Sequence, residues 1–218
     1  MKDIKAAVFD MDGLMFDTEK LWLDSVMKTN EVYGYNVPME LAMECVGKRK
    51  DYTKLRLKEV FGDDFDADKF RELNVHFMEE DVKKNGLKVK KGLVELLEYL
   101  VVNGVKVAIA SSSSNDEIKN RFKEAHMSLI YFDSIIGGEL VNEPKPHPQI
   151  YLKSCEALNV KPEEAIALED SEYGIIAASK AGMKVILIPD VKMPSEETRK
   201  LVYRRCNNLL EVISLFEE

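Results

Sequence analysis

Residues 5–13, KAAVFDMDG, join a short apolar run to two aspartates, Asp10 and Asp12, and a glycine. An unbroken apolar run of this length is typical of a strand that is buried on both faces of a parallel sheet. Similar runs, separated by helical patterns, follow from about residue 88: VKVAIA at 105–110, SIIG at 134–137, AIALE at 165–169 and KVILI at 184–188. This alternation predicts an α/β fold in which helices cover a parallel sheet.

Residues 17–87 differ from the rest because they contain three helical patterns of apolar residues and no β-rich run. The strand at the N-terminus belongs with the later strands, so this helical stretch interrupts the α/β core in sequence. We therefore expect one domain from residues 1–16 and 88–218 and an inserted, all-helical domain from residues 17–87. The length of 218 residues suits one full core and one smaller unit.

The composition excludes several classes of protein. With 31 Lys and Arg against 39 Asp and Glu, the net charge is −8, whereas nucleic-acid binding needs a basic face. The three cysteines are far apart and favour neither a disulfide framework nor a zinc site. No apolar run is long enough for a signal peptide or a membrane span. We expect a cytoplasmic protein that binds neither nucleic acid nor membrane.

Four polar segments follow predicted strands, and each alone has an ordinary structural explanation. FDMDG at 9–13 and LED at 168–170 end strands with two acids each, as strands entering turns often do. ASSSSND at 110–116 is typical of a helix cap, although Ser111 and the N–H groups of the helix start would also suit a phosphate. In EPKPHP at 143–148, Lys145 stands between two prolines, where a solvated loop lysine is the simpler interpretation.

Together the four segments indicate a ligand site, because the carboxyl ends of parallel strands share one edge of the sheet. They contribute four acids: Asp10, Asp12, Glu169 and Asp170. Lys145 reduces their charge of −4 only to −3. Two like charges about 4 Å apart repel by roughly 4 kcal/mol at an effective dielectric constant of 20. A divalent cation would relieve this repulsion, and oxygen ligands without cysteine or histidine indicate Mg2+.

The chain resembles the haloacid dehalogenase-like hydrolase superfamily in four motifs: FDMDGLMFDTE, ASSSS, KPHPQIY and LEDSEYGIIAASKAGM. Their order and spacing cover the whole predicted core. The helical stretch after the first motif is similar to the cap of the β-phosphoglucomutase-like phosphatase branch. The resemblance implies a Rossmann-like three-layer core with a parallel sheet, a helical cap, and a Mg2+-dependent phosphatase. Its substrate would be a small phosphorylated metabolite such as a sugar phosphate, and the capped family suggests a monomer.

The resemblance also implies roles for the residues that act on the phosphoryl group. Asp10 would be the nucleophile that forms an aspartyl-phosphate. Asp12 would protonate the leaving alcohol and then activate water for the second step, so one residue switches from acid to base. Ser111 would hold a phosphoryl oxygen, with help from Ser112 and Asn115.

Charge control and metal binding are implied in the same way. Lys145 would bridge Asp10 and the phosphoryl group and neutralise charge as it develops. Mg2+ would be held by the Asp10 side chain, the Asp12 carbonyl and Asp170, and Glu169 would order a coordinated water.

The cap is expected to select the substrate. In the family a glycine-containing cap segment faces the active site, and here the corresponding basic turn comprises Gly47, Lys48, Arg49 and Lys50. Its cations would bind a second anionic or hydroxylated part of the substrate, unless they are only a solvated charge run.

A β-phosphoglucomutase, which moves phosphate within a sugar, is the closest alternative. Its family pattern has a histidine ten residues after the acid-base aspartate, whereas this chain has Trp22 there, which favours a phosphatase. A dehalogenase would lack the acid at Asp12. A phosphonate-cleaving enzyme would need a particular cap lysine, and nothing in the sequence selects one. A catalytically silent phosphate-binding module is disfavoured because every catalytic position is filled.

Overall fold

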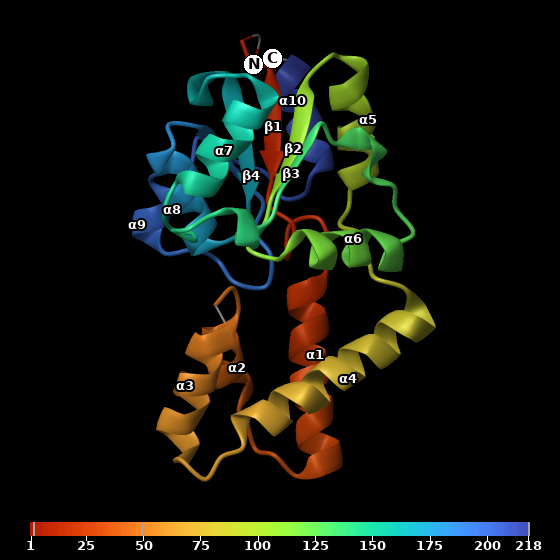
Figure 1. The fold of residues 1–218 in the computed structure, drawn as a ribbon, viewed down its shortest axis with the longest axis vertical. Helices are drawn as coiled ribbons and strands as arrows, with labels where there is room; N and C mark the ends of the chain where they lie inside the picture. The colour runs from red at the N-terminus through yellow and green to blue at the C-terminus, as the bar shows by residue number, and fades with distance from the viewer. Residues whose placement is uncertain (2, 49, 218) are drawn as a thin grey trace. The chain divides into compact units, whose positions relative to one another are not determined.

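The computed structural model describes residues 1, 3–48 and 50–217 (Figure 1). It divides into two compact units. The first, called the core, consists of Met1–Asp17 and Leu87–Glu218. The second, called the helical unit, consists of Thr18–Gly86.

The core is built on a six-stranded parallel sheet with the order β3-β2-β1-β4-β5-β6. The strands are β1 (Ala6–Phe9), β2 (Lys106–Ala110), β3 (Ser134–Ile136), β4 (Ala165–Glu169), β5 (Lys184–Leu187) and β6 (Arg204–Arg205). All four residues of β1 are fully buried. A central parallel strand is covered on both faces, which explains why its sequence is apolar throughout.

Helices cover both faces of this sheet. They are α5 (Leu93–Val102), α6 (Asn115–Glu124), α7 (Gln149–Leu158), α8 (Glu172–Lys180), α9 (Glu196–Arg199) and α10 (Leu210–Glu217), with short 3-10 turns η1 (Leu129–Tyr131), η2 (Gly138–Leu140) and η3 (Pro162–Glu164). The helices α7 and α8 lie on one side of the sheet, and α5 and α10 lie on the other (Figure 1). The predicted α/β fold, with its Rossmann-like three-layer core, is confirmed.

Serine caps determine where two of the core helices begin. The Ser114 hydroxyl accepts a hydrogen bond from the backbone N–H of Glu117, and the Glu117 carboxylate accepts one from the Ser114 N–H. At α8, the Ser171 hydroxyl accepts from the backbone N–H of Gly174. Because each cap immediately follows a strand and its turn, it also fixes the direction in which the chain leaves the edge of the sheet.

The helical unit contains α1 (Thr18–Tyr33), α2 (Met39–Cys45), α3 (Lys50–Phe61) and α4 (Ala67–Asn85). The helices α1 and α4 pack together, and a buried hydrogen bond joins Thr29 Oγ1 to Asn74 Oδ1 at 2.5 Å. The sequence patterns predict three helices here, and α2 is missed because its seven residues are too few to show a helical period. In the part of the chain that the structure describes, no helix has the length and apolar character that a membrane span requires.

The chain segments that lead to and from the helical unit pair with each other inside the core. The backbone N–H of Asp17 donates to the Lys88 carbonyl at 3.0 Å, and the N–H of Lys90 donates to the Met15 carbonyl at 2.9 Å. An antiparallel bridge between Phe16 and Val89 lies between these bonds. The two segments that connect the core to the helical unit are therefore held side by side by core residues alone.

Candidate active site

A buried acidic cluster lies at the carboxyl edge of the sheet. Asp10 follows β1, and Glu169 and Asp170 stand at the end of β4. The two strands are direct neighbours, with Phe9 paired to Leu168, so their ends emerge side by side. One oxygen from each of the three carboxylates lies within 4.8 Å of the other two, and all three residues are buried. The structure thus brings together acids that are about 160 residues apart in the sequence.

Lys145 lies within this cluster. Its Nζ donates to Asp10 Oδ1 at 2.5 Å and to Glu169 Oε1 at 2.6 Å, and its side chain is only 6% exposed. Burial alone would lower the pKa of Lys145, but the carboxylates of Asp10 and Glu169 raise it well above its usual value. The amine therefore stays charged. Lys145 is a partner of two carboxylates, and the simpler interpretation as a solvated loop lysine does not hold.

Tyr151 supports both Lys145 and Glu169 from within α7. Its hydroxyl donates to Glu169 Oε1 at 2.5 Å and accepts from Lys145 Nζ at 3.2 Å. The other Glu169 oxygen, Oε2, accepts from the N–H and the hydroxyl of Ser171 at 3.2 and 2.9 Å. Protein donors thus engage both oxygens of the fully buried Glu169, which suits a residue that orients its neighbours. The sequence analysis does not predict Tyr151 as a site residue. Its sequence offers one indication of such a role, which is that the hydroxyl of a buried tyrosine needs a hydrogen-bond partner.

The carboxyl of Asp10 is strongly affected by its surroundings. Burial raises the pKa of Asp10 from 3.8 to about 7. Lys145 opposes this effect, whereas the charges of Glu169 and Asp12 add to it. The charged form of Asp10 therefore needs more positive charge nearby than one lysine supplies.

The serine turn after β2 contacts Asp12. The hydroxyl of Ser113 donates to Asp12 Oδ2 at 2.9 Å, and the Ser113 N–H donates to Ser111 Oγ at 3.1 Å. Ser111 is buried, in keeping with a place inside the site. Ser113 was not among the predicted residues, because a run of four serines gives no indication of which hydroxyl turns inward.

Two other predicted residues of this turn have less central positions. Ser112 is exposed. Asn115 begins α6, and its backbone N–H donates to Glu139 Oε1 at 2.9 Å. The Asn115 side-chain oxygen stands next to Gly137. The predicted help of these residues in holding phosphate stays a prediction.

The basic turn predicted to bind substrate belongs to the helical unit. Gly47 has a positive φ of 70° in the connection between α2 and α3, Lys48 Nζ lies 5.8 Å from the centre of the Tyr52 ring, and Lys50 begins α3. Arg49 lies outside the described residues. The contribution of this turn to substrate choice remains a prediction.

The acidic cluster fits a hard divalent cation. Its ligand atoms are all carboxylate oxygens, and they are close enough to converge on one ion. Gly13 borders the same cluster: a Cβ at this position would stand 2.5 Å from Asp170 Oδ2, so only glycine permits this approach. The residues predicted to hold Mg2+ are Asp10 and Asp170 through their side chains and Asp12 through its carbonyl. Glu169, predicted to order a coordinated water, has both oxygens engaged by Lys145, Tyr151 and Ser171, and its role at the metal stays a prediction.

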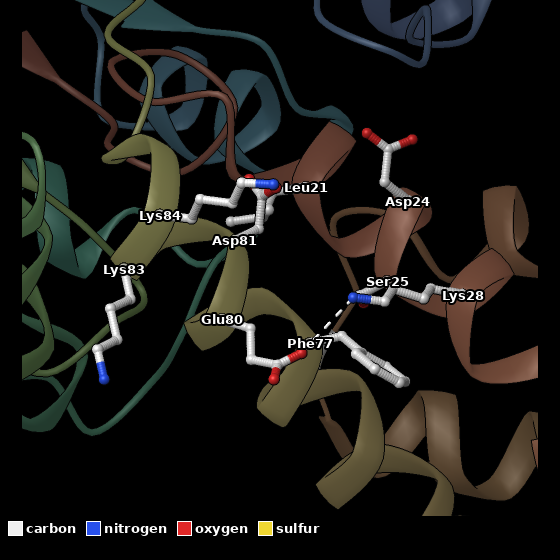
Figure 2. Close-up of a pocket in the computed structure, with 9 residues that line it drawn as sticks. All are labelled: Leu21, Asp24, Ser25, Lys28, Phe77, Glu80, Asp81, Lys83 and Lys84. Atoms are coloured by element: carbon white, nitrogen blue, oxygen red, sulfur yellow. Dashed lines mark ion pairs between the residues drawn. The ribbon is translucent and has the colours of Figure 1, made fainter. Parts of the chain in front are cut away.

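The helical unit has a cavity of its own, of about 670 Å³, between α1 and α4 (Figure 2). In it, Lys28 Nζ lies 3.5 Å from Glu80 Oε2 and 4.4 Å from the centre of the Phe77 ring. None of the predicted site residues that the structure describes lines this cavity.

Comparison with known proteins agrees with this site. Residues 7–188 match the family described as haloacid dehalogenase-like hydrolase. The chain is 32% identical to a phosphorylated carbohydrates phosphatase of Thermotoga maritima, over 84% of each chain. Among solved structures, a β-phosphoglucomutase-like protein from Thermotoga maritima has a TM-score of 0.81 at 26% identity, covering 98% of this chain and 99% of the other. CbbY from Rhodobacter sphaeroides, in complex with phosphate, has a TM-score of 0.75 at 25% identity over 96% of each chain.

The family match covers most of the chain and includes the segments that carry Asp10, Lys145 and Asp170. The resemblance inferred from the four motifs is therefore confirmed, and the chain belongs to the haloacid dehalogenase-like hydrolase family.

Proposed function

We propose that this protein is a Mg2+-dependent phosphatase that hydrolyses small phosphorylated metabolites, phosphorylated carbohydrates above all, through an aspartyl-phosphate on Asp10. One observation carries the proposal: Lys145 Nζ lies 2.5 Å from Asp10 Oδ1 and 2.6 Å from Glu169 Oε1, next to Asp170. This arrangement holds a nucleophilic carboxylate beside a fixed cation, and the remaining acids suit a metal ion. The phosphatase similar in sequence and the phosphate complex of CbbY support this assignment.

In the first step, a carboxylate oxygen of Asp10 attacks the phosphorus, and the bond from phosphorus to the substrate alcohol breaks. Asp12 gives its proton to the leaving oxygen. The Ser113 hydroxyl, at 2.9 Å from Asp12 Oδ2, fixes the orientation of this acid. Lys145 stays protonated and offsets the negative charge of the phosphoryl oxygens, which is the main requirement of phosphoryl transfer.

In the second step, the ionised Asp12 takes a proton from a water molecule, whose oxygen attacks the phosphorus. The bond between phosphorus and Asp10 breaks, phosphate leaves, and both aspartates return to their starting states. When bound at Asp10 and Asp170, with the Asp12 carbonyl as a further ligand, Mg2+ supplies positive charge to the phosphoryl oxygens. Glu169 holds Lys145 in place throughout.

A phosphate-release screen tests the proposal directly. Purified protein with Mg2+ is offered sugar, polyol and nucleotide phosphates, and we expect turnover that is lost in Asp10→Asn. Asp116→Asn is a matched control, because this acid lies on α6 with a side chain that is 89% exposed. Release that survives in Asp10→Asn, or that is unchanged by EDTA, would contradict the proposal.

The same preparation distinguishes the mutase. A β-hexose 1-phosphate that is isomerised, in the presence of a bisphosphate activator, faster than phosphate is released would assign the protein to the mutases. Trp22, at the position of the mutase histidine, favours release. We further propose a cytoplasmic monomer, which light scattering of the purified protein and cell fractionation would test.

A further inference from the structure

A fifth acid, Asp190, lies on the loop that follows β5. Its Oδ1 forms an ion pair with Lys90 Nζ, and its side chain is only 7% exposed. Its other oxygen, Oδ2, is buried and accepts no hydrogen bond from any residue that the structure describes. Burying a carboxylate oxygen without a donor is unfavourable, so Oδ2 needs a partner beyond these side chains.

The surroundings of Gly13 show that this oxygen lies near Asp170, one acid of the cluster. A Cβ at Gly13 would stand 2.5 Å from Asp170 Oδ2 and 3.2 Å from Asp190 Oδ2, so both carboxylates border the same space. Gly13 has a positive φ of 82°, which glycine adopts without steric cost, and it has no side chain to clash with these two carboxylates. Asp190 is not in the group of carboxylates whose oxygens lie within 4.8 Å of one another, so it stands one step further from the centre.

Lys90 fixes the orientation of Asp190. Besides its ion pair with Asp190 Oδ1, Lys90 Nζ donates to Asp17 Oδ1 at 3.0 Å. The backbone of Lys90 is itself held by its hydrogen bond to the Met15 carbonyl. With Oδ1 held by this lysine, the carboxylate can present only Oδ2 to the space beside Gly13.

We propose that Asp190 is a positioning residue of the cation site, whose Oδ2 accepts a hydrogen bond from a water molecule bound to the metal ion at Asp10 and Asp170. Such a water supplies the donor that Oδ2 needs and separates the carboxylates of Asp170 and Asp190. The inference rests on the proposed function, because it requires the cation. Carboxylates in such supporting positions typically strengthen metal binding by about 10- to 100-fold.

The test is Mg2+ binding to the full chain, measured by isothermal titration calorimetry without substrate. Asp190→Asn should weaken Mg2+ binding by about tenfold, because an amide is a poorer acceptor for a polarised water. Asp17→Asn is the matched control: it also removes one negative charge beside Lys90 but leaves Asp190 in place, and its Mg2+ affinity should stay within about twofold of the original. With Mn2+ as the probe, Asp190→Asn should change the water-proton relaxation per bound ion, and Asp17→Asn should not.

An Mg2+ affinity of Asp190→Asn that matches Asp17→Asn would overturn the inference. If Asp190→Asn also released phosphate normally, the proposed function would stand. The proposed function itself would be refuted if the original protein neither bound Mg2+ nor released phosphate. If Asp190→Asn does not fold, as judged by circular dichroism, the double variant Lys90→Met/Asp190→Asn leaves no unpaired buried charge. It should show the same tenfold weakening, and unchanged binding there would refute the role of Asp190.

Discussion

Replacing Asp10 by Asn should abolish phosphate release and also stabilise the Mg2+-free protein at neutral pH. Release should be lost because an amide cannot replace the attacking carboxylate. The stabilisation follows because burial raises the pKa of Asp10 from 3.8 to about 7. At about 1.4 kcal/mol for each tenfold change in an ionisation constant, ionising Asp10 costs roughly 4 kcal/mol more in the fold than in the unfolded chain. Asparagine has nearly the shape of the protonated acid and carries no charge. We therefore expect the free energy of unfolding at pH 8 to rise by up to about 4 kcal/mol.

The pH dependence has a definite sign. As pH rises, the unfolded chain loses this proton near its ordinary pKa of 3.8, before the folded protein does near 7. The unfolded state then binds fewer protons, so the contribution of Asp10 to stability falls between about pH 4 and pH 7 and is constant above that range. Asp10→Asn should remove this fall. Bound Mg2+ should reduce it, because the cation stabilises the ionised carboxylate.

Urea unfolding in EDTA at pH 5 and pH 8, followed by far-UV circular dichroism, measures these differences. The single tryptophan, Trp22, lies in α1, so its fluorescence reports on the helical unit separately. Asp116→Asn serves as the control for removal of an exposed acid. An Asp10→Asn protein that is no more stable than the original at pH 8 would refute the reasoning. So would the same pH dependence in both proteins.

Three further changes test other parts of the site. Tyr151→Phe removes the hydroxyl shared by Lys145 and Glu169. Steady-state kinetics should then show a kcat about tenfold lower with little change in KM. A KM that changes by as large a factor as kcat would contradict an orienting role. Gly174→Ala should lower the melting temperature and remove activity, because the added Cβ would overlap the Glu169 carboxylate. In an ordinary helix the same change stabilises by about 1 kcal/mol. A higher melting temperature would therefore disprove this close approach. Chelation by EDTA should stop phosphate release and added Mg2+ should restore it, as followed by a continuous phosphate assay, and activity that persists in EDTA would exclude a metal-dependent reaction.

Much of the core could be predicted from the sequence because its signals are local. Strands β1 to β5 are short, largely apolar runs, whereas the two exposed arginines of β6 give no such signal. Ser114 and Ser171 end the turns after β2 and β4 with recognisable caps. Parallel strands carry their carboxyl ends to one edge of a sheet, so Asp10 and Asp170 could be predicted to share that edge. Their close approach also needs β1 and β4 to be neighbours, which the sequence does not indicate.

The supporting residues could not be predicted because their positions depend on packing between distant elements. Tyr151 stands in a helix beside apolar residues, where an aromatic ring is ordinarily core, and only the fold places its hydroxyl under Lys145. Asp190 follows a proline after a strand, which is typical of an exposed turn, yet its side chain is 7% exposed because Lys90 pairs with it from 100 residues away. Four serines follow one another in the turn, and the fold of the turn likewise decides which of their hydroxyls contacts Asp12.

The two chain segments that lead to and from the helical unit are paired within the core, and this pairing matters for engineering the chain. Because Asp17 and Lys88 already lie in hydrogen-bonded register within the core, an insert of any length meets two ends that are fixed close together. Exchanging one insert for another then adds little closure entropy, which grows only slowly with length. The junction is a natural place to graft the insert of a relative, because the exchange would leave the parallel sheet and its acidic cluster unchanged.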